Sequence, residues 1–200
     1  MRARLAIASA CLQVDLREIL LRDKAPEFLA VSPSATVPCL VTEQSVIDES
    51  RDIMVWALQQ NDPESWLRMP DAGWDIIDDI EGPFKQALDR YKYSGRYEAA
   101  DKQSERSKAS QSLLALNARL DGQDFLFGAG ATLADMATLP FVRQFANTDR
   151  DWFDAQDWPH LAAWLNAFLA SDRFQSIMTK YPTWKPNDPV THFPTTSPKA

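Results

Sequence analysis

The sequence predicts an α/β unit followed by an all-helical unit. Short apolar runs bounded by turn residues, typical of strands, stand at residues 12–17, 37–41 and 46–47. From Gly73 onward this strand signal disappears, and apolar residues recur at helical spacing. Residues 61–65, Asn-Asp-Pro-Glu-Ser, have the composition of a linker between the two units.

The composition is that of an ordinary globular protein, and it excludes several classes of partner. Hydrophobic residues make up 45% and charged residues 24% of the 200 residues, and the net charge is −7. This acidic balance argues against nucleic acid or an anionic membrane as the main partner. No apolar run approaches the roughly 20 residues of a membrane span, and no signal peptide is visible. With only Cys11 and Cys39, the sequence predicts a cytoplasmic protein without a disulfide scaffold or a metal site.

The first unit opens with a predicted helix over residues 2–11, where apolar residues recur at helical spacing. Apolar and polar residues then alternate over residues 12–17, which predicts a half-buried strand. Residues 20–25 form a loop, and Pro26 suits the first turn of a short helix over residues 27–31.

The most informative stretch is the run at residues 37–41, Val-Pro-Cys-Leu-Val. It predicts a strand interrupted by a proline, which cannot donate to a ladder. A turn at residues 42–45 leads into a second short strand at residues 46–47, and a helix follows over residues 50–60. This order places a Val-Pro backbone and a helix N-terminus side by side, which suits a peptide-like, anionic ligand.

The second unit begins with a predicted helix from Trp74 to Tyr91, kinked at Gly82-Pro83. A second long helix is predicted over residues 98–120. The motif Thr132-Leu133-Ala134-Asp135 has the shape of a capping box and opens a further helix.

Pro159 starts the next helix, and a short helix is predicted near residues 174–178. The proline-rich segment after Pro182 reads as an extended tail. The predicted organisation is therefore a first domain over residues 1–60, a linker over 61–72, a helical domain over 73–181 and a tail over 182–200.

With these motifs in place, the chain resembles a soluble glutathione transferase over nearly its whole length. The motifs that carry the resemblance are Lys24, the Val37-Pro38 pair, the Asp48-Glu49-Ser50 triplet, the linker, and the capping box before Pro140. The spacing of Lys24 from Val37 is most similar to omega-type and related bacterial cysteine-type members. The resemblance implies a thioredoxin-like N-terminal domain followed by a helical-bundle C-terminal domain.

The resemblance also implies a glutathione site. In the family, the residue before a cis-proline exchanges backbone hydrogen bonds with the cysteinyl unit of glutathione, and Val37-Pro38 matches that pair. Glu49 would take the ammonium group, and the γ-glutamyl carboxylate would meet the helix start and the Ser50 hydroxyl. Lys24 would meet the glycyl carboxylate as a flexible point charge.

Each of these residues also has a purely structural interpretation. Pro38 suits an edge strand, and Glu49 and Ser50 suit a helix start without any ligand. Lys24 suits a solvated loop. Cys39 is expected to be buried and inert, and Cys11 to be a core residue.

A second-substrate pocket is predicted at Tyr91, Tyr93 and Trp164. The alternative is that these aromatic side chains belong to the core, where residues at helical spacing usually lie.

The chain departs from the family pattern at its start. In cysteine-type members, a strand and a loop resembling Cys-Pro-Tyr-Ala precede the segment that matches residues 1–6. The first strand and the activating group for the glutathione sulfur are therefore expected to be missing, and no catalytic residue is assigned. Either the natural protein is longer and catalytic, which we favour, or the short form binds without catalysing.

The predicted function is a glutathione transferase-like protein that binds glutathione as co-substrate. Thiol transfer, reduction or conjugation would follow if the missing loop exists, with a small electrophile or a mixed disulfide as the second substrate. A homodimer is expected from the resemblance. The alternative function is a non-catalytic glutathione-fold module for binding or dimerisation.

Overall fold

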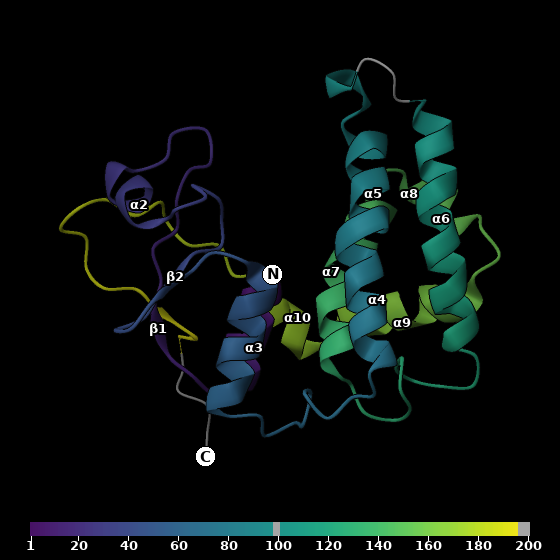
Figure 1. The fold of residues 1–200 in the computed structure, drawn as a ribbon, viewed down its shortest axis with the longest axis horizontal. Coiled ribbons are helices and arrows are strands. Elements are labelled where there is room, and N and C mark those ends of the chain that lie inside the picture. Colours follow the sequence, from purple (N-terminus) through teal and green to yellow (C-terminus); the bar gives the residue numbers. More distant parts are fainter. Residues whose placement is uncertain (98–100, 196–200) are drawn as a thin grey trace. The chain divides into compact units, whose positions relative to one another are not determined.

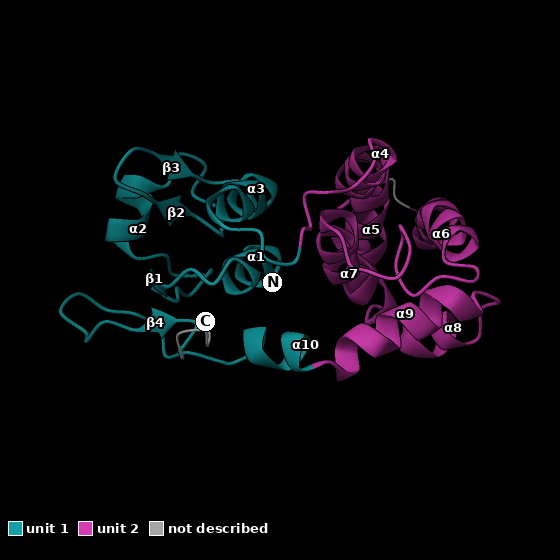
Figure 2. Cartoon of the chain, turned by 90° about the horizontal axis from the view of Figure 1, so that it is seen from below, with its two compact units in different colours: residues 1–64, 172–200 teal, residues 65–171 magenta. Residues whose placement is uncertain are grey.

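The computed structural model describes residues 1–97 and 101–195. The chain forms two compact units (Figures 1 and 2). Unit 1 consists of Met1–Glu64 together with the described residues from Asp172 onward, and unit 2 is Ser65–Ser171. Unit 1 combines short strands with helices and unit 2 is helical, so the predicted α/β plus all-α class is confirmed.

The core of unit 1 is the contact between α1 (Arg2–Ser9) and α3 (Ser50–Gln60). Both helices form where the apolar periodicity predicts them, because neither helix carries a proline or glycine and each has an apolar stripe to bury. The apolar side chains of this contact that are at most 5% exposed are Leu5, Ala6, Ile7, Ile53, Met54, Ala57 and Leu58.

The strands of unit 1 are shorter than the sequence predicts. β2 (Leu40–Val41) pairs with β3 (Val46–Ile47), and β1 (Val14–Asp15) pairs with β4 (His192–Phe193), both antiparallel. The two pairs form separate two-stranded sheets. The proline predicted to interrupt the 37–41 run lies just before β2, where no ladder bond is required.

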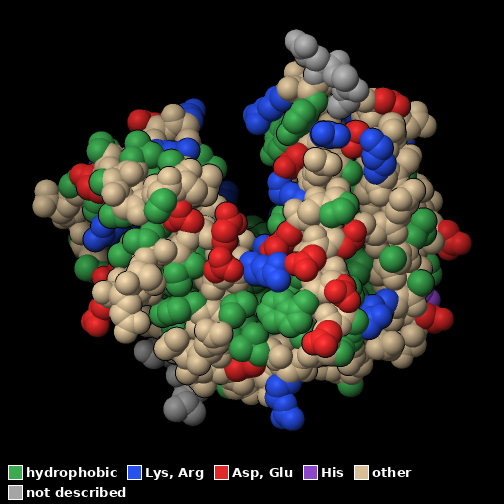
Figure 3. All heavy atoms as spheres, in the orientation of Figure 1, with side chains coloured by type: hydrophobic (Ala, Val, Ile, Leu, Met, Phe, Trp, Pro, Cys, Tyr) green, Lys and Arg blue, Asp and Glu red, His purple; other side chains and the backbone are tan. Residues whose placement is uncertain are grey.

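The segment from residue 11 to residue 50 buries almost nothing. Its only buried side chain is that of Ser32, and the helix α2 (Pro26–Val31) has no buried residue at all. Hydrophobic side chains therefore reach the surface over this unit (Figure 3). An isolated two-stranded hairpin is marginally stable in water, so α1 and α3 supply the apolar core on which these strands depend.

The described part of the C-terminal segment packs on unit 1, whereas the sequence analysis assigned residues 172–181 to the helical domain and treated 182–200 as a tail. Strand β4 covers one edge of β1, and Phe193 is 2% exposed. The Leu16 N–H donates to the carbonyl of Thr191 at 2.7 Å, which extends the pairing. A two-residue strand in a proline-rich segment shows no apolar periodicity. The sequence alone therefore does not predict that the C-terminal segment pairs with β1.

Arg4 of α1 holds the same segment in place. Its guanidinium donates to the carbonyls of Ile177 and Thr179, each at 3.2 Å, and pairs with Glu18 at 2.5 Å. It also lies over the Phe193 ring, 5.6 Å from the centroid. One side chain thus joins α1, the residues after β1, the end of α10 (Asp172–Ile177) and β4.

Unit 2 opens with one continuous helical stretch formed by α4 (Ala72–Asp79), a π-helical segment (Ile80–Phe84) and α5 (Lys85–Lys92). The π-helical segment contains Pro83, and proline lacks the N–H that a regular helical turn would use. Trp66 is fully buried, and its carbonyl accepts from the N–H of Leu133 at 2.9 Å. The part of the predicted 61–72 linker that follows Glu64 therefore belongs to unit 2.

The next elements are a short 3-10 turn (Ser94–Arg96) and the helix α6 (Lys102–Arg119). Asp101 caps α6 by accepting from the N–H groups of Gln103 and Ser104. The predicted start of this helix at residue 98 lies outside the described residues.

The predicted capping box is confirmed at the start of α7 (Leu133–Ala146). The Asp135 carboxylate is fully buried and accepts from the Thr132 N–H, the Thr132 hydroxyl and the Leu126 N–H, each at 2.8 Å. Burial raises the pKa of Asp135, while these hydrogen bonds act in the opposite direction. The carboxylate therefore fixes the preceding connector as well as the helix.

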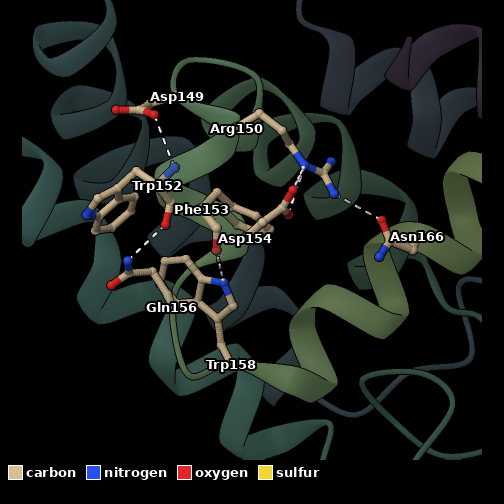
Figure 4. A network of polar contacts seen from close by, with 8 residues as sticks. All are labelled: Asp149, Arg150, Trp152, Phe153, Asp154, Gln156, Trp158 and Asn166. Carbon is tan, nitrogen blue, oxygen red and sulfur yellow. Dashed lines mark hydrogen bonds and ion pairs between the residues drawn. The ribbon is translucent and has the colours of Figure 1, made fainter.

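A short helix missed by the sequence analysis, α8 (Arg150–Asp154), precedes α9 (Pro159–Ala170). Figure 4 shows how its turn is closed. Asp149 caps the helix by accepting from the Trp152 N–H at 3.2 Å, and the Trp158 indole donates to the carbonyl of Phe153 at 2.9 Å. Five residues are too few for a clear helical period, which explains why the pattern did not reveal this element.

Replacing Phe193 should destabilise unit 1. Phe193→Ala should lower the free energy of unfolding by about 3 kcal/mol, because it removes a ring that is 2% exposed and leaves a cavity in its place. Urea denaturation measures the change. Val190→Ala is the matched control because Val190 is 63% exposed in the same segment, and it should stay within about 0.5 kcal/mol of wild type. Equal effects of the two substitutions would contradict the packing described for β4.

Replacing Asp135 should destabilise unit 2. Asp135→Ala leaves buried donors of Thr132 and Leu126 without their acceptor, so a loss of about 3 kcal/mol is expected. Thermal denaturation followed by circular dichroism measures it. Asp124→Ala, an exposed aspartate in the same connector, serves as the control and should leave the midpoint nearly unchanged.

Candidate functional site: a cis-proline hairpin and a helix start

The register of the β2–β3 hairpin brings the two predicted halves of the site together. Leu40 pairs with Ile47 and Val41 with Val46. The Val37–Pro38 bond lies just before β2, and α3 begins just after β3, so the hairpin connects the two halves. Cys39 and Asp48, which flank the paired residues, lie close enough for each group to shift the pKa of the other.

The Val37–Pro38 peptide bond is cis, as the sequence analysis predicts. Val37 is 45% exposed, and among the described residues its backbone N–H and carbonyl have no hydrogen-bond partner. A short extended backbone with a free donor and a free acceptor can pair with the backbone of a peptide ligand, as an added strand does.

The opposite half of the site is the N-terminus of α3, which begins at the predicted residue, Ser50. Glu49 occupies the N-cap position, but no side chain caps the helix, and the Glu49 carboxylate is exposed. The first N–H groups of an eleven-residue helix carry a partial positive charge that favours an anion. Glu49 adds a carboxylate beside it that would suit a cation.

Arg2 adds a positive charge at this helix start, and the sequence analysis missed it. The residue is only 7% exposed, and its guanidinium donates to the Ser50 hydroxyl at 3.1 Å. The packing of α1 against α3 makes this contact. The one signal in the sequence was that Arg2 and Arg4 stand in the first turn of a helix whose other residues are mostly apolar.

Cys39 follows the cis-proline but is no nucleophile at neutral pH. Partial burial, together with a hydrogen bond to the Asp48 carboxylate, raises the pKa of Cys39 to about 11. The thiol therefore stays protonated. Cys11 is exposed, so the prediction that it lies in the core is wrong; it ends the first helical segment in a left-handed conformation with φ of 56°.

The remaining predicted ligand residue, Lys24, lies in the loop before α2 and is half-buried. Among the described residues it forms no ion pair and no hydrogen bond. The structure therefore leaves its ammonium group available without bringing it into contact with Val37, Glu49 or Ser50.

The aromatic residues predicted to line a second pocket are not brought together. Tyr91 is 1% exposed and packs against Phe145, with ring centroids 5.4 Å apart, and Trp164 is 5% exposed. Both are core residues of unit 2, and burial raises the pKa of Tyr91. Tyr93 is half-buried, with the Arg96 guanidinium 4.6 Å from its ring centroid.

The described residues offer neither a metal site nor a membrane-spanning helix. They contain no cluster of three or more histidine, cysteine, aspartate or glutamate side chains arranged to hold a metal ion. None of their helices is long and apolar enough to cross a membrane.

A strand-containing unit with a cis-proline hairpin and an uncapped helix start, followed by a helical unit, defines the class of two-unit α/β plus all-α proteins. Comparison of the sequence with protein families agrees with this class. The family model described as "Glutathione S-transferase, N-terminal domain" matches residues 1–66, and "Glutathione S-transferase, C-terminal domain" matches residues 75–167. The chain belongs to the glutathione S-transferase family.

Individual relatives agree with this assignment. The chain is similar to glutathione S-transferase D7 of Drosophila melanogaster, with 30% identity over 160 residues. The match covers 70% of this chain and 64% of that relative, so the chain spans slightly less than two thirds of the relative's length.

Solved structures show the same fold. A glutathione transferase family member from Pseudomonas fluorescens, solved with two glutathione molecules bound, superposes with a TM-score of 0.74 at 18% identity, over 88% of this chain and 86% of that one. The omega 3C transferase of Trametes versicolor gives a TM-score of 0.71 at 15% identity, over 90% and 84% of the two chains. The thioredoxin-like N-terminal domain and the helical C-terminal domain are therefore confirmed.

The two cysteines should differ sharply in reactivity. At pH 8 a thiol with a pKa of about 11 is about one part in a thousand thiolate. Alkylation by iodoacetamide should therefore be slow for Cys39, and its rate should still be rising with pH above pH 10. The Cys11→Ser variant isolates Cys39, and the Cys39→Ser variant isolates Cys11 as the exposed reference. A plateau in the Cys39 rate below pH 9 would contradict the protonated thiol.

Proposed function

We propose that this chain binds glutathione at the site formed by Val37, Pro38, Glu49 and Ser50. The observation that supports the proposal is the β2–β3 hairpin, which connects the free backbone of Val37, just before β2, with the uncapped start of α3, just after β3. Glutathione offers a peptide backbone, a γ-glutamyl group with one carboxylate and one ammonium, and a glycyl carboxylate. Each of these groups finds a chemically matched partner in unit 1.

In the proposed complex, the cysteinyl unit of glutathione exchanges backbone hydrogen bonds with Val37. The γ-glutamyl carboxylate accepts from the uncapped N–H groups of α3 and from the Ser50 hydroxyl, with the charge of Arg2 beside it. Glu49 takes the ammonium group. Lys24 meets the glycyl carboxylate as a flexible point charge.

The proposed chemistry is that of the cysteine-type members that the sequence resembles, namely thiol transfer or reduction of a mixed disulfide, with conjugation to a small electrophile as the broader family reaction. Such chemistry needs a thiolate or a group that activates the glutathione sulfur. Cys39 does not qualify because its thiol stays protonated. We propose that a cysteine on a further loop supplies this group.

We also propose that a further strand completes the sheet of unit 1. Among the described residues, β1 pairs only with β4 and β2 only with β3, so each has an edge that no strand covers. The unburied side chains of residues 11–50 agree with an incomplete layer. The reading frame upstream of codon 1 tests this proposal. An in-frame strand pattern ending in Cys-Pro-x-Ala would support it, and a stop codon immediately before Met1 would contradict it.

For the second substrate, Tyr93 is the strongest of the three predicted aromatic residues because Tyr91 and Trp164 are almost fully buried. A cytoplasmic homodimer is proposed from the family resemblance. The competing function is a non-catalytic module that binds glutathione or a second copy, and it is favoured by the absence of a reactive thiolate at Cys39.

Substitutions at the helix start should weaken glutathione binding. Glu49→Gln should raise the dissociation constant by about tenfold or more, because a charge-assisted contact is worth about 1.5–3 kcal/mol. Ser50→Ala should raise it about threefold to tenfold. Isothermal titration with glutathione measures both changes, and retention on immobilised glutathione gives a rapid screen.

Glu43→Gln is the matched control, since it removes the same charge from the exposed turn of the same hairpin. It should leave the dissociation constant unchanged. Failure of the wild-type protein to bind glutathione would refute the proposed function. Turnover of a chloronitroaromatic or of a glutathione mixed disulfide would then separate conjugation from reduction, and binding without either turnover would favour the non-catalytic module.

A further inference from the structure

Asp48 follows strand β3 and binds side-chain and backbone donors of residues that precede the hairpin, yet it belongs to neither half of the proposed site. Its carboxylate accepts from the Ser34 N–H at 2.8 Å and from the Ser32 hydroxyl at 3.4 Å. The Cys39 thiol lies close enough to this carboxylate to lower its pKa. The two serines precede the Val37–Pro38 bond and Cys39 follows it, so the carboxylate binds the segment before this bond and lies near the residue after it.

The contacts continue toward Val37 along the preceding turn. The Ser34 hydroxyl accepts from the N–H of Thr36 at 3.2 Å and lies 2.5 Å from the Thr36 hydroxyl. Thr36 is the residue directly before Val37. A chain of hydrogen bonds therefore runs from Asp48 through Ser34 and Thr36 to the backbone that would pair with the ligand.

In the sequence, Asp48 directly precedes the start of helix α3. Glu49 is the N-cap of α3 and Ser50 is its first residue. The segment from residue 11 to residue 50 has no apolar core of its own, since only the polar Ser32 is buried there. Apolar packing therefore does not fix the distance between the turn and the helix. Besides the pairing of β2 with β3, the Asp48 contacts with Ser32 and Ser34 are polar interactions that span it.

We propose that Asp48 is a positioning residue of this site: its carboxylate fixes the Val37 backbone opposite the start of α3. The expected effect on glutathione affinity rests on the proposed function. The contacts of Asp48 are independent of it. Asp48 touches no part of the ligand in this proposal and acts through Ser34, Thr36 and Cys39.

The ionised form of Asp48 suits this task. The backbone N–H of Ser34 is the main cause that lowers the pKa of Asp48, with the hydroxyls of Ser34 and Ser32 and the thiol of Cys39 acting in the same direction. All these neighbouring groups donate hydrogen bonds, so a side chain that only accepts hydrogen bonds fits this position best. An asparagine has one oxygen to accept and an amide group that would face donors instead.

The test compares Asp48→Ala, Asp48→Asn and the control Glu43→Gln by two measurements. Hydrogen exchange of the segment at residues 32–38, followed by mass spectrometry without glutathione, reports whether the turn is held. Exchange of this segment should rise at least tenfold in Asp48→Ala, rise less in Asp48→Asn, and stay unchanged in Glu43→Gln. Exchange in the α1–α3 core should be the same in all three variants, which shows that unit 1 remains folded.

The second measurement is glutathione affinity by isothermal titration. Asp48→Ala should bind about tenfold more weakly than wild type and Asp48→Asn about threefold more weakly. Unchanged exchange at residues 32–38 in Asp48→Ala overturns the inference, whether or not glutathione binds. Raised exchange with an affinity within twofold of wild type also overturns it and leaves the proposed function standing. If wild type binds no glutathione, the proposed function fails, and the exchange result still decides whether Asp48 holds the turn.

Discussion

The antiparallel register of β2 with β3 is the constraint on which the rest of the site depends. Only two residue pairs define it, Leu40 with Ile47 and Val41 with Val46. A slip by one residue would turn every side chain of one strand to the other face and would shift Val37 away from Ser50. The hairpin therefore connects two segments, at Val37 and at Ser50, that stand thirteen positions apart in the sequence. The α1–α3 core then holds the helix end of this arrangement.

The charges at the start of α3 are the second feature that defines the site. The uncapped start of α3 carries a partial positive charge, and the buried Arg2 adds a full charge beside the Ser50 hydroxyl. The Glu49 carboxylate points to solvent and supplies the opposite sign. Positive charge from the helix start and Arg2 therefore lies beside the negative charge of Glu49. This combination matches the carboxylate and the ammonium of an α-amino acid group. The same logic makes Cys39 unreactive, because Asp48 and partial burial keep its thiol protonated.

The parts that the sequence predicted correctly are those with local causes. The bounds of α3, the capping box at Thr132 and Asp135, and the cis bond before Pro38 depend on neighbouring residues or on a motif that the family shares. The parts that it missed depend on distant partners. Arg2 contacts Ser50 only because α1 packs on α3. Strand β4 pairs with β1, which lies far from it in the sequence. The contacts of Asp48 with Ser32 and Ser34 are likewise set by the hairpin and not by any pattern visible along the sequence.

The most direct test of this account is the exchange rate of the Val37 amide with and without saturating glutathione, measured by nuclear magnetic resonance. If the cysteinyl backbone of glutathione pairs with Val37, this amide should become protected by at least tenfold, while amides in the exposed turn at Glu43 and Gln44 keep their rates. The dipeptide Cys-Gly, which lacks the γ-glutamyl group, should give little protection at the same concentration. Binding of glutathione without any protection of Val37 would contradict the account, because the ligand would then occupy a different part of the chain.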